Sequence, residues 1–170
     1  MKPNILCLVS EDCPPLLSSY GNSVCRTPSL DNFATQSLIF NNAYCTSPVC
    51  GPSRFSLLTG KMPESYPPAQ HMRSNGNVPK NLTTLPGILR SAGYYCTNNE
   101  KTDYNCNIDL SSIWDDCSNK AHWKNCPKGV PFFSIFNCML THECCVFSTV
   151  DGVIKTEDVI VPPHLPDTIQ

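Results

Sequence analysis

Short, almost continuous apolar runs constrain the fold of this chain more than any other feature. Residues 4–10 have the sequence NILCLVS, and residues 131–139 have the sequence PFFSIFNCM. Apolar runs of this length are typical of strands that are buried on both faces of a parallel sheet. Weaker strand patterns cover residues 38–44 and 94–97. Helical segments separate the strands, so the order of elements predicts an α/β fold with a mostly parallel central sheet flanked by helices.

Three segments between these strands have the end signals and the periodicity of helices. The first begins at Thr27 and Pro28, the second covers residues 50–60, and the third covers residues 84–92 and stops at Gly93. Apolar residues recur on one face of the first and third segments, as expected for helices that pack on a core. We expect this apolar face to contain Leu30, Phe33, Leu85, Ile88 and Leu89.

The composition limits the domain organisation and the partners. A chain of 170 residues is long enough for one domain with a substantial core. Its net charge of -2 gives no reason to expect nucleic acid or an anionic membrane as a partner. No apolar run approaches the ~20 residues of a membrane-spanning helix, and we expect no signal peptide within this chain. The twelve cysteines form no repeated Cys-x-x-Cys pair, which argues against a zinc ribbon and leaves the redox compartment open.

Residues 50–60, with the sequence CGPSRFSLLTG, carry the strongest chemical signal. Pro52 favours the first turn of a helix, and Gly60 can supply the left-handed residue after its end. Cys50 would therefore lie at a helix N-terminus, where backbone N–H groups and the helix dipole attract an anion. Arg54 lies one turn further on and adds a planar cation that suits sulfate or phosphate. The segment thus predicts a nucleophile beside an anion site.

Other chemically active residues follow strands of the predicted sheet. Glu11 and Asp12 come directly after the first strand, Lys101 follows the strand at 94–97, and His142 follows the strand at 131–139. In open α/β sheets ligands bind beyond the carboxyl ends of the strands, so we expect these residues to share one edge with Cys50. Paired carboxylates such as Glu11 and Asp12 are the ligands that a hard divalent cation prefers.

The segment 50–60 resembles the signature of the type I, formylglycine-dependent sulfatases, which has Cys-x-Pro-Ser-Arg followed by Leu-Thr-Gly. The resemblance implies an alkaline-phosphatase-like sulfatase fold, with residues 1–170 as the N-terminal part of the catalytic domain and its C-terminal part absent. It also implies that a formylglycine-generating maturation enzyme oxidises Cys50, and that the hydrated aldehyde is the nucleophile. Family members are often periplasmic, lysosomal or secreted.

The resemblance also assigns roles to single residues. Glu11, Asp12 and the residue derived from Cys50 would bind Ca²⁺ or Mg²⁺, although Glu11 stands where the family usually has Asp. Arg54 would hold the formylglycine, Lys101 would bind the sulfate, and His142 would contact the sulfate or protonate the leaving oxygen. His71 falls where sulfatases often place substrate-contacting residues, and a solvated loop would explain it equally well.

Three functions remain open at this level. Ser47-Pro48-Val49 before Cys50, together with residues 165–168, is similar to a heparan N-sulfatase-like branch, which implies a sulfated carbohydrate as substrate. The first function is therefore hydrolysis of a sulfuric ester or sulfamate, carried by an incomplete fragment of the enzyme. The second is a related phosphate- or phosphonate-ester hydrolase of the same superfamily. The third is a non-catalytic, cysteine-rich remnant or binding module.

Overall fold

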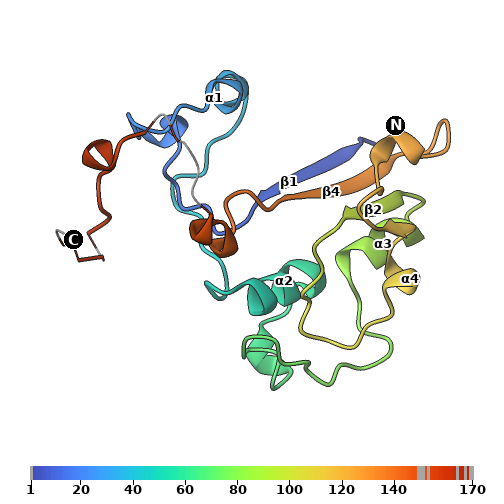
Figure 1. The fold of residues 1–170 in the computed structure, drawn as a ribbon. Helices are drawn as coiled ribbons and strands as arrows, with labels where there is room; N and C mark the ends of the chain where they lie inside the picture. Colours follow the sequence, from blue (N-terminus) through green and yellow to red (C-terminus); the bar gives the residue numbers. More distant parts are fainter. Residues whose placement is uncertain (1, 149–151, 153, 164, 167, 169–170) are drawn as a thin grey trace. The chain divides into compact units, whose positions relative to one another are not determined.

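A computed structural model describes residues 2–148, 152, 154–163, 165, 166 and 168. The chain forms two compact units (Figure 1). Unit 1 contains residues 1–11 and 44–141, and unit 2 contains residues 12–43 and 142–170. Each unit has its own network of contacts. Asp167, part of the motif at 165–168, lies outside the described residues.

Unit 1 is built on a four-stranded parallel sheet with the strand order β1-β4-β2-β3. The strands are β1 (Ile5–Ser10), β2 (Tyr95–Asn99), β3 (Asp116–Cys117) and β4 (Phe132–Cys138). The long apolar runs of the sequence form β1 and β4, which pair side by side (Figure 1). The parallel α/β fold predicted from the order of elements is therefore confirmed, as are the three strands predicted at 4–10, 94–97 and 131–139.

Helices cover the sheet of unit 1 and begin and end where the sequence predicted. Helix α2 (Cys50–Thr59) ends at Gly60, whose φ of 66° is left-handed. Helix α3 (Leu85–Ser91) begins after Thr84, whose hydroxyl accepts a hydrogen bond from the Gly87 N–H. The remaining helical segments of unit 1 are short, namely α4 (Leu110–Ile113) and the 3-10 helices Pro63–Ser65 and Trp123–Asn125.

The core of unit 1 lies between one face of the sheet and the helices. Phe133 and Trp114 stack there with ring centroids 6.0 Å apart, and Leu58 of α2 packs in the same cluster. On the opposite face of the sheet, Trp123 stacks on Phe132 at 5.6 Å. Because side chains alternate along a strand, β1 contributes to the core through only one of its faces. Its other face remains open, and Leu8 is 70% exposed.

Unit 2 contains helix α1 (Pro28–Ala34) and three 3-10 helices, Ser18–Tyr20, Glu143–Phe147 and Thr156–Asp158. The Asp31 carboxylate of α1 accepts hydrogen bonds from the hydroxyls of Ser18 and Thr27. These bonds tie the N-terminus of α1 to the preceding 3-10 helix. Polar contacts therefore organise this end of unit 2.

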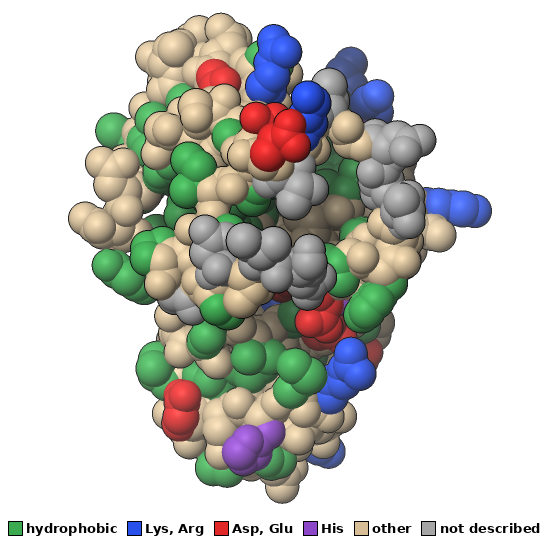
Figure 2. Space-filling view, turned by 60° about the vertical axis from the view of Figure 1, so that its left-hand side comes forward, with side chains coloured by type: hydrophobic (Ala, Val, Ile, Leu, Met, Phe, Trp, Pro, Cys, Tyr) green, Lys and Arg blue, Asp and Glu red, His purple; other side chains and the backbone are tan. Residues whose placement is uncertain are grey.

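Two expectations from the sequence are wrong. The strand predicted at 38–44 is absent, because this described segment pairs with no strand and leaves Leu38 and Phe40 exposed. β propensity depends on packing within a sheet, and this segment lacks that packing. The predicted apolar helix faces are also largely uncovered, since Leu30, Phe33, Leu85 and Ile88 are exposed. Apolar side chains are spread over the face of the molecule drawn in Figure 2.

Within the described residues, none of the helices combines the length and the apolar character needed to cross a membrane.

Candidate active site

Glu11 is the centre of a buried charge cluster in unit 1. One of its carboxylate oxygens contacts Nη2 of Arg54, and the other lies 2.8 Å from Nζ of Lys101. The side chains of all three residues are at least nine-tenths buried. The end of β1, the first turns of α2 and the loop after β2 therefore meet at one carboxylate, which joins three of the residues singled out in the sequence.

The cluster favours the charged forms of Glu11 and Lys101. Burial by itself would raise the pKa of Glu11, but hydrogen bonds from Lys101 and Arg54 outweigh it and keep the pKa below its ordinary value. Burial would likewise lower the pKa of Lys101, but the hydrogen bond and charge of Glu11 raise it above its ordinary value. Lys101 is therefore protonated and Glu11 ionised at neutral pH.

Cys50 is the first residue of α2, and its Sγ lies within 4.8 Å of a carboxylate oxygen of Glu11. The first backbone N–H groups of any helix lack acceptors within the helix and favour an anion beside them. The structure therefore brings the Cys50 position, a helix N-terminus and two cations together within unit 1. Cys50 and Arg54 were singled out from residues 50–60, and Lys101 from its place after a strand; the catalytic roles of all three stay a prediction.

Asn105 fixes the residue that follows Cys50. A Cβ at Gly51 would lie 2.7 Å from Cγ of Asn105, so only glycine fits without displacement. The Asn105 amide is buried and donates hydrogen bonds to the carbonyls of Ala69 and His71, at 2.9 and 2.7 Å. The loop that carries His71 is thereby tied to the start of α2. The His71 ring itself is exposed and lies 3.5 Å from the amide nitrogen of Gln70.

Asp12 and His142 belong to unit 2, where they lie close together. Nε2 of His142 is 3.9 Å from a carboxylate oxygen of Asp12, which also accepts a hydrogen bond from the Glu143 N–H. The other ring nitrogen of His142 lies 3.1 Å from Sγ of Cys144. His142 thus begins the 3-10 helix at Glu143 as its N-cap.

Metal binding can be tested against the donors of unit 1. Glu11 supplies the carboxylate oxygens that Ca²⁺ or Mg²⁺ prefers, but both oxygens already contact cations. Calcium takes six to eight oxygen ligands. Glu11 and Cys50 offer ligand atoms within 4.8 Å of each other, but two groups are too few for such an ion, so a metal held here would need further ligands.

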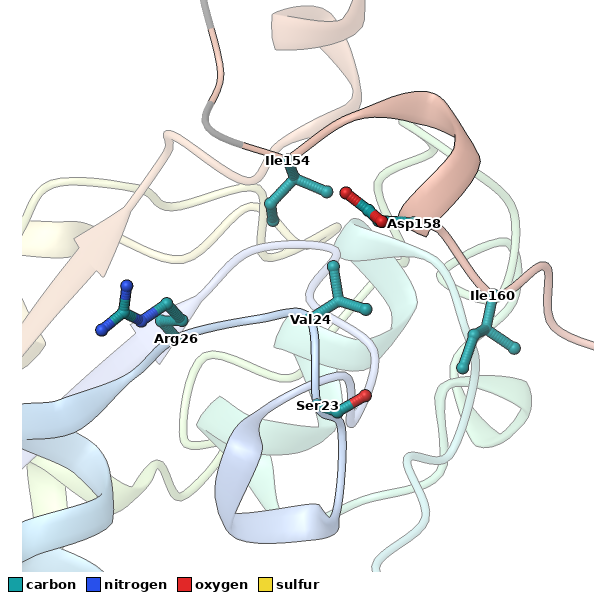
Figure 3. A pocket seen from close by; sticks show the side chains of 6 residues that line it. All are labelled: Ser23, Val24, Arg26, Ile154, Asp158 and Ile160. Atoms are coloured by element: carbon teal, nitrogen blue, oxygen red, sulfur yellow. The ribbon is translucent and has the colours of Figure 1, made fainter.

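Each unit contains one hollow of note among its described residues. A cavity of about 240 Å³ in unit 1 is lined mainly by apolar residues of β1, α2, α3 and β4, with Arg54 on its wall. A pocket of about 650 Å³ in unit 2 is lined by Ser23, Val24, Arg26, Ile154, Asp158 and Ile160 (Figure 3). Arg26, Asp158 and Ile160 are exposed in this pocket, so it offers no buried catalytic group.

Comparison with known proteins identifies the family of this chain. A family model described as Sulfatase matches residues 3–157. This chain belongs to the sulfatase family. It is 42% identical over 158 residues to an ulvan-active sulfatase of Formosa agariphila, covering 86% of this chain and 26% of that protein. It is also 35% identical over 94 residues to the iduronate 2-sulfatase of Homo sapiens, covering 54% of this chain and 16% of that protein.

The fold is likewise that of the sulfatases. The solved structure of a 2-O GAG sulfatase matches with a TM-score of 0.71 at 23% identity, covering 98% of this chain and 42% of that chain. The chain spans about a quarter of the length of the ulvan-active sulfatase, and less of the iduronate 2-sulfatase. The prediction of a sulfatase fold is confirmed, and the heparan N-sulfatase-like branch stays a prediction.

Sequence reasoning missed three asparagines that lie within or beside these side-chain contacts. Asn98 and Asn137 contact Lys101 and Arg54 from β2 and β4, and Asn105 anchors the loop beside Gly51. The signal that could have found two of them is their position. Asn98 and Asn137 are polar residues at strand positions whose alternation faces the core, where an amide requires hydrogen-bond partners.

Proposed function

We propose that this chain carries the nucleophile side of a sulfatase active site, which hydrolyses sulfate esters of a glycan. The observation that supports this most is the convergence of Arg54 and Lys101 on Glu11, with Cys50 at the adjoining helix N-terminus. Two buried cations at a helix N-terminus form a site for a tetrahedral anion. Because the chain belongs to the sulfatase family, sulfate is the proposed anion.

The chemistry assigned to Cys50 requires its oxidation to formylglycine, which when hydrated supplies the hydroxyl nucleophile. Arg54 would hold this residue and the bound ester in a fixed orientation, because its guanidinium is itself held by Glu11. Lys101 keeps its proton on Nζ and would neutralise charge that develops on the sulfuryl oxygens. Glu11 keeps both cations in place and stays ionised.

His142, Asp12, His71 and the metal enter this proposal from the family resemblance alone. We infer that His142 contacts the sulfate or protonates the leaving oxygen, and that His71 contacts the substrate. Glu11, Asp12 and the Cys50-derived residue are the proposed ligands of Ca²⁺ or Mg²⁺. Because unit 1 supplies too few oxygen ligands, further metal ligands must come from outside it.

A sulfated glycan is the proposed substrate class. The support is the identity to an ulvan-active sulfatase over 86% of the chain, together with the shorter match to an iduronate 2-sulfatase. Both named activities concern sulfated carbohydrates. A formylglycine-generating enzyme is the second proposed partner, because Cys50 needs one to become the nucleophile.

The test measures which esters the chain recognises. The chain is co-expressed with a formylglycine-generating enzyme and given nitrophenyl sulfate, nitrophenyl phosphate or a sulfated oligosaccharide. Release of sulfate that Cys50→Ala abolishes would support the proposal. Preferential release of phosphate would favour the phosphate-ester hydrolase instead. Equal, weak binding of inorganic sulfate by wild type and by Arg54→Ala would favour the non-catalytic module.

A further inference from the structure

We propose that Asn137, itself held by Asn98, is a positioning residue that fixes the direction of the Arg54 guanidinium. The inference rests on the proposed function only for its consequence in catalysis, since the geometry belongs to unit 1 alone. Neither asparagine was predicted to take part in the site.

A closed ring of hydrogen bonds connects these residues. Nη2 of Arg54 donates to Oδ1 of Asn137 at 2.7 Å, and Nδ2 of Asn137 donates to Oδ1 of Asn98 at 3.1 Å. Nδ2 of Asn98 donates to the Lys101 carbonyl at 2.9 Å. The ring closes where Nη1 of Arg54 donates to the same carbonyl at 3.3 Å.

The ring allows only one orientation of each amide. If the Asn137 amide were turned over, its NH₂ group would face the guanidinium, and its oxygen would face the oxygen of Asn98. The second bond of Asn137 Nδ2, to the Asn99 carbonyl at 2.9 Å, fixes the same orientation. Asn98 is fully buried, so its amide has no access to water as an alternative partner.

Arg54 depends on this ring because its Nε has no hydrogen-bond partner among the described residues. The plane of the guanidinium is therefore set only through Nη1 and Nη2. Their partners are Glu11, the Lys101 carbonyl and Asn137. Without Asn137, Nη2 would keep only Glu11, and the 3.3 Å bond from Nη1 to the Lys101 carbonyl would be the one other contact that resists rotation of the guanidinium.

The neighbouring buried pair Thr97 and Ser134 provides a matched control. Their hydroxyls are 2.5 Å apart on the same two strands, β2 and β4. Both residues are as buried as Asn98, but strand alternation places them on the opposite face of the sheet. Removing this hydrogen bond disturbs the same strands without reaching Arg54.

The experiment follows the side-chain NMR signals of Arg54 in the full chain labelled with ¹⁵N-arginine, assigned with Arg54→Lys. We expect Asn137→Ala to merge the two Nη signals by faster rotation and to weaken binding of inorganic sulfate about tenfold, since a hydrogen bond to a charged group is worth roughly that factor or more. Asn137→Asp, which keeps the acceptor for Arg54, should keep the Nη signals separate. Ser134→Ala should leave both the signals and sulfate binding unchanged.

Two outcomes would overturn the inference: Arg54 signals that Asn137→Ala leaves unchanged, or signals that Ser134→Ala alters to the same extent. If Asn137→Ala does not fold, Asn137→Leu keeps the side-chain shape without its polar groups and carries the same prediction. Failure of the proposed function would look different. Sulfate would then leave Arg54 of the wild type unshifted, while Asn137→Ala still merged its signals.

Discussion

The Glu11 carboxylate lies against the Arg54 guanidinium, although 43 residues separate them in the sequence. The contact joins the end of β1 to the first turns of α2. The Thr141 hydroxyl donates to the Glu11 carbonyl, and the Glu11 N–H donates to the Cys138 carbonyl at 3.1 Å, so the backbone of Glu11 is also held. Glu11 is thus a fixed anion that holds the cations Arg54 and Lys101 in position.

Replacing Glu11 by Gln should lower the free energy of unfolding by about 3 kcal/mol, because it leaves two buried cations without their counter-charge. Urea denaturation followed by tryptophan fluorescence measures this change, since Trp114 and Trp123 are the two tryptophans of the chain and both lie in unit 1. The control is Asp103→Asn, which removes an exposed carboxylate 3.6 Å from Lys101 and should change stability by less than about 0.5 kcal/mol. Equal stability of Glu11→Gln and wild type would refute this role of Glu11.

The same cluster predicts a pH dependence of stability. The pKa of Glu11 is lowered in the folded chain, so its contribution is complete above the ordinary value of 4.5 and is lost as the pH falls through the lowered value. The pKa of Lys101 is raised, so its contribution is complete below the ordinary value of 10.5 and is lost as the pH rises through the raised value. Wild type should lose more stability than Glu11→Gln below about pH 4. Parallel pH profiles of the two proteins would contradict the assignment.

Gly51→Ala should destabilise the chain by about 1–3 kcal/mol, as overpacking of a close contact usually does. The new Cβ would collide with the Asn105 side chain, whose bonds to Ala69 and His71 prevent it from moving freely. Thermal and urea unfolding measure the effect, and Asn105→Ala is the second variant of a double-mutant cycle. The two substitutions together should cost less than the sum of their separate effects. Strict additivity would show that the contact carries no strain.

Leu8→Lys should reduce self-association of the chain with a change in stability below about 0.5 kcal/mol. β1 is an edge strand of the described sheet, and its open face exposes Leu6 and Leu8. Sedimentation velocity at several concentrations measures association. Leu38→Lys removes an even more exposed leucine that lies outside any described strand, and it should have a smaller effect. A larger effect of Leu38→Lys would show that the open face of β1 is not the surface through which the chain associates.

The sequence predicted the elements whose signals are local. The apolar runs of β1 and β4, the Thr84 cap and the left-handed Gly60 depend on residues next to one another, and the structure has each of them. The strand predicted at 38–44 failed because strand formation needs a neighbouring strand, which no local pattern reveals. The exposed Leu85 and Ile88 show the same limit, since periodicity does not say what covers a face.

The site could be predicted in part for a similar reason. Cys50 and Arg54 were found from the motif that begins a helix, and Glu11 and Lys101 from their places after strands, with the family resemblance giving Lys101 its role. Their meeting follows from the parallel strand order. Strand alternation marks Asn98 and Asn137 as amides that face the core, but it does not reveal their partners. The ring depends on the register that places Asn99 opposite Phe136, next to Asn137, and a single sequence does not show that register.

The central claim is that Cys50 becomes the nucleophile of a sulfatase. The most direct measurement is mass spectrometry of the tryptic peptide that contains Cys50, after co-expression with a formylglycine-generating enzyme that converts a control sulfatase. The account predicts a peptide lighter by the difference between CH₂SH and CHO, which also reacts with a hydrazide. Arg54→Lys tests whether the formylglycine-generating enzyme needs the arginine of the signature as well as the cysteine. Cys45, five residues before Cys50, serves as the internal control thiol. An unmodified thiol or a disulfide at Cys50, with the control sulfatase fully converted, would contradict the account.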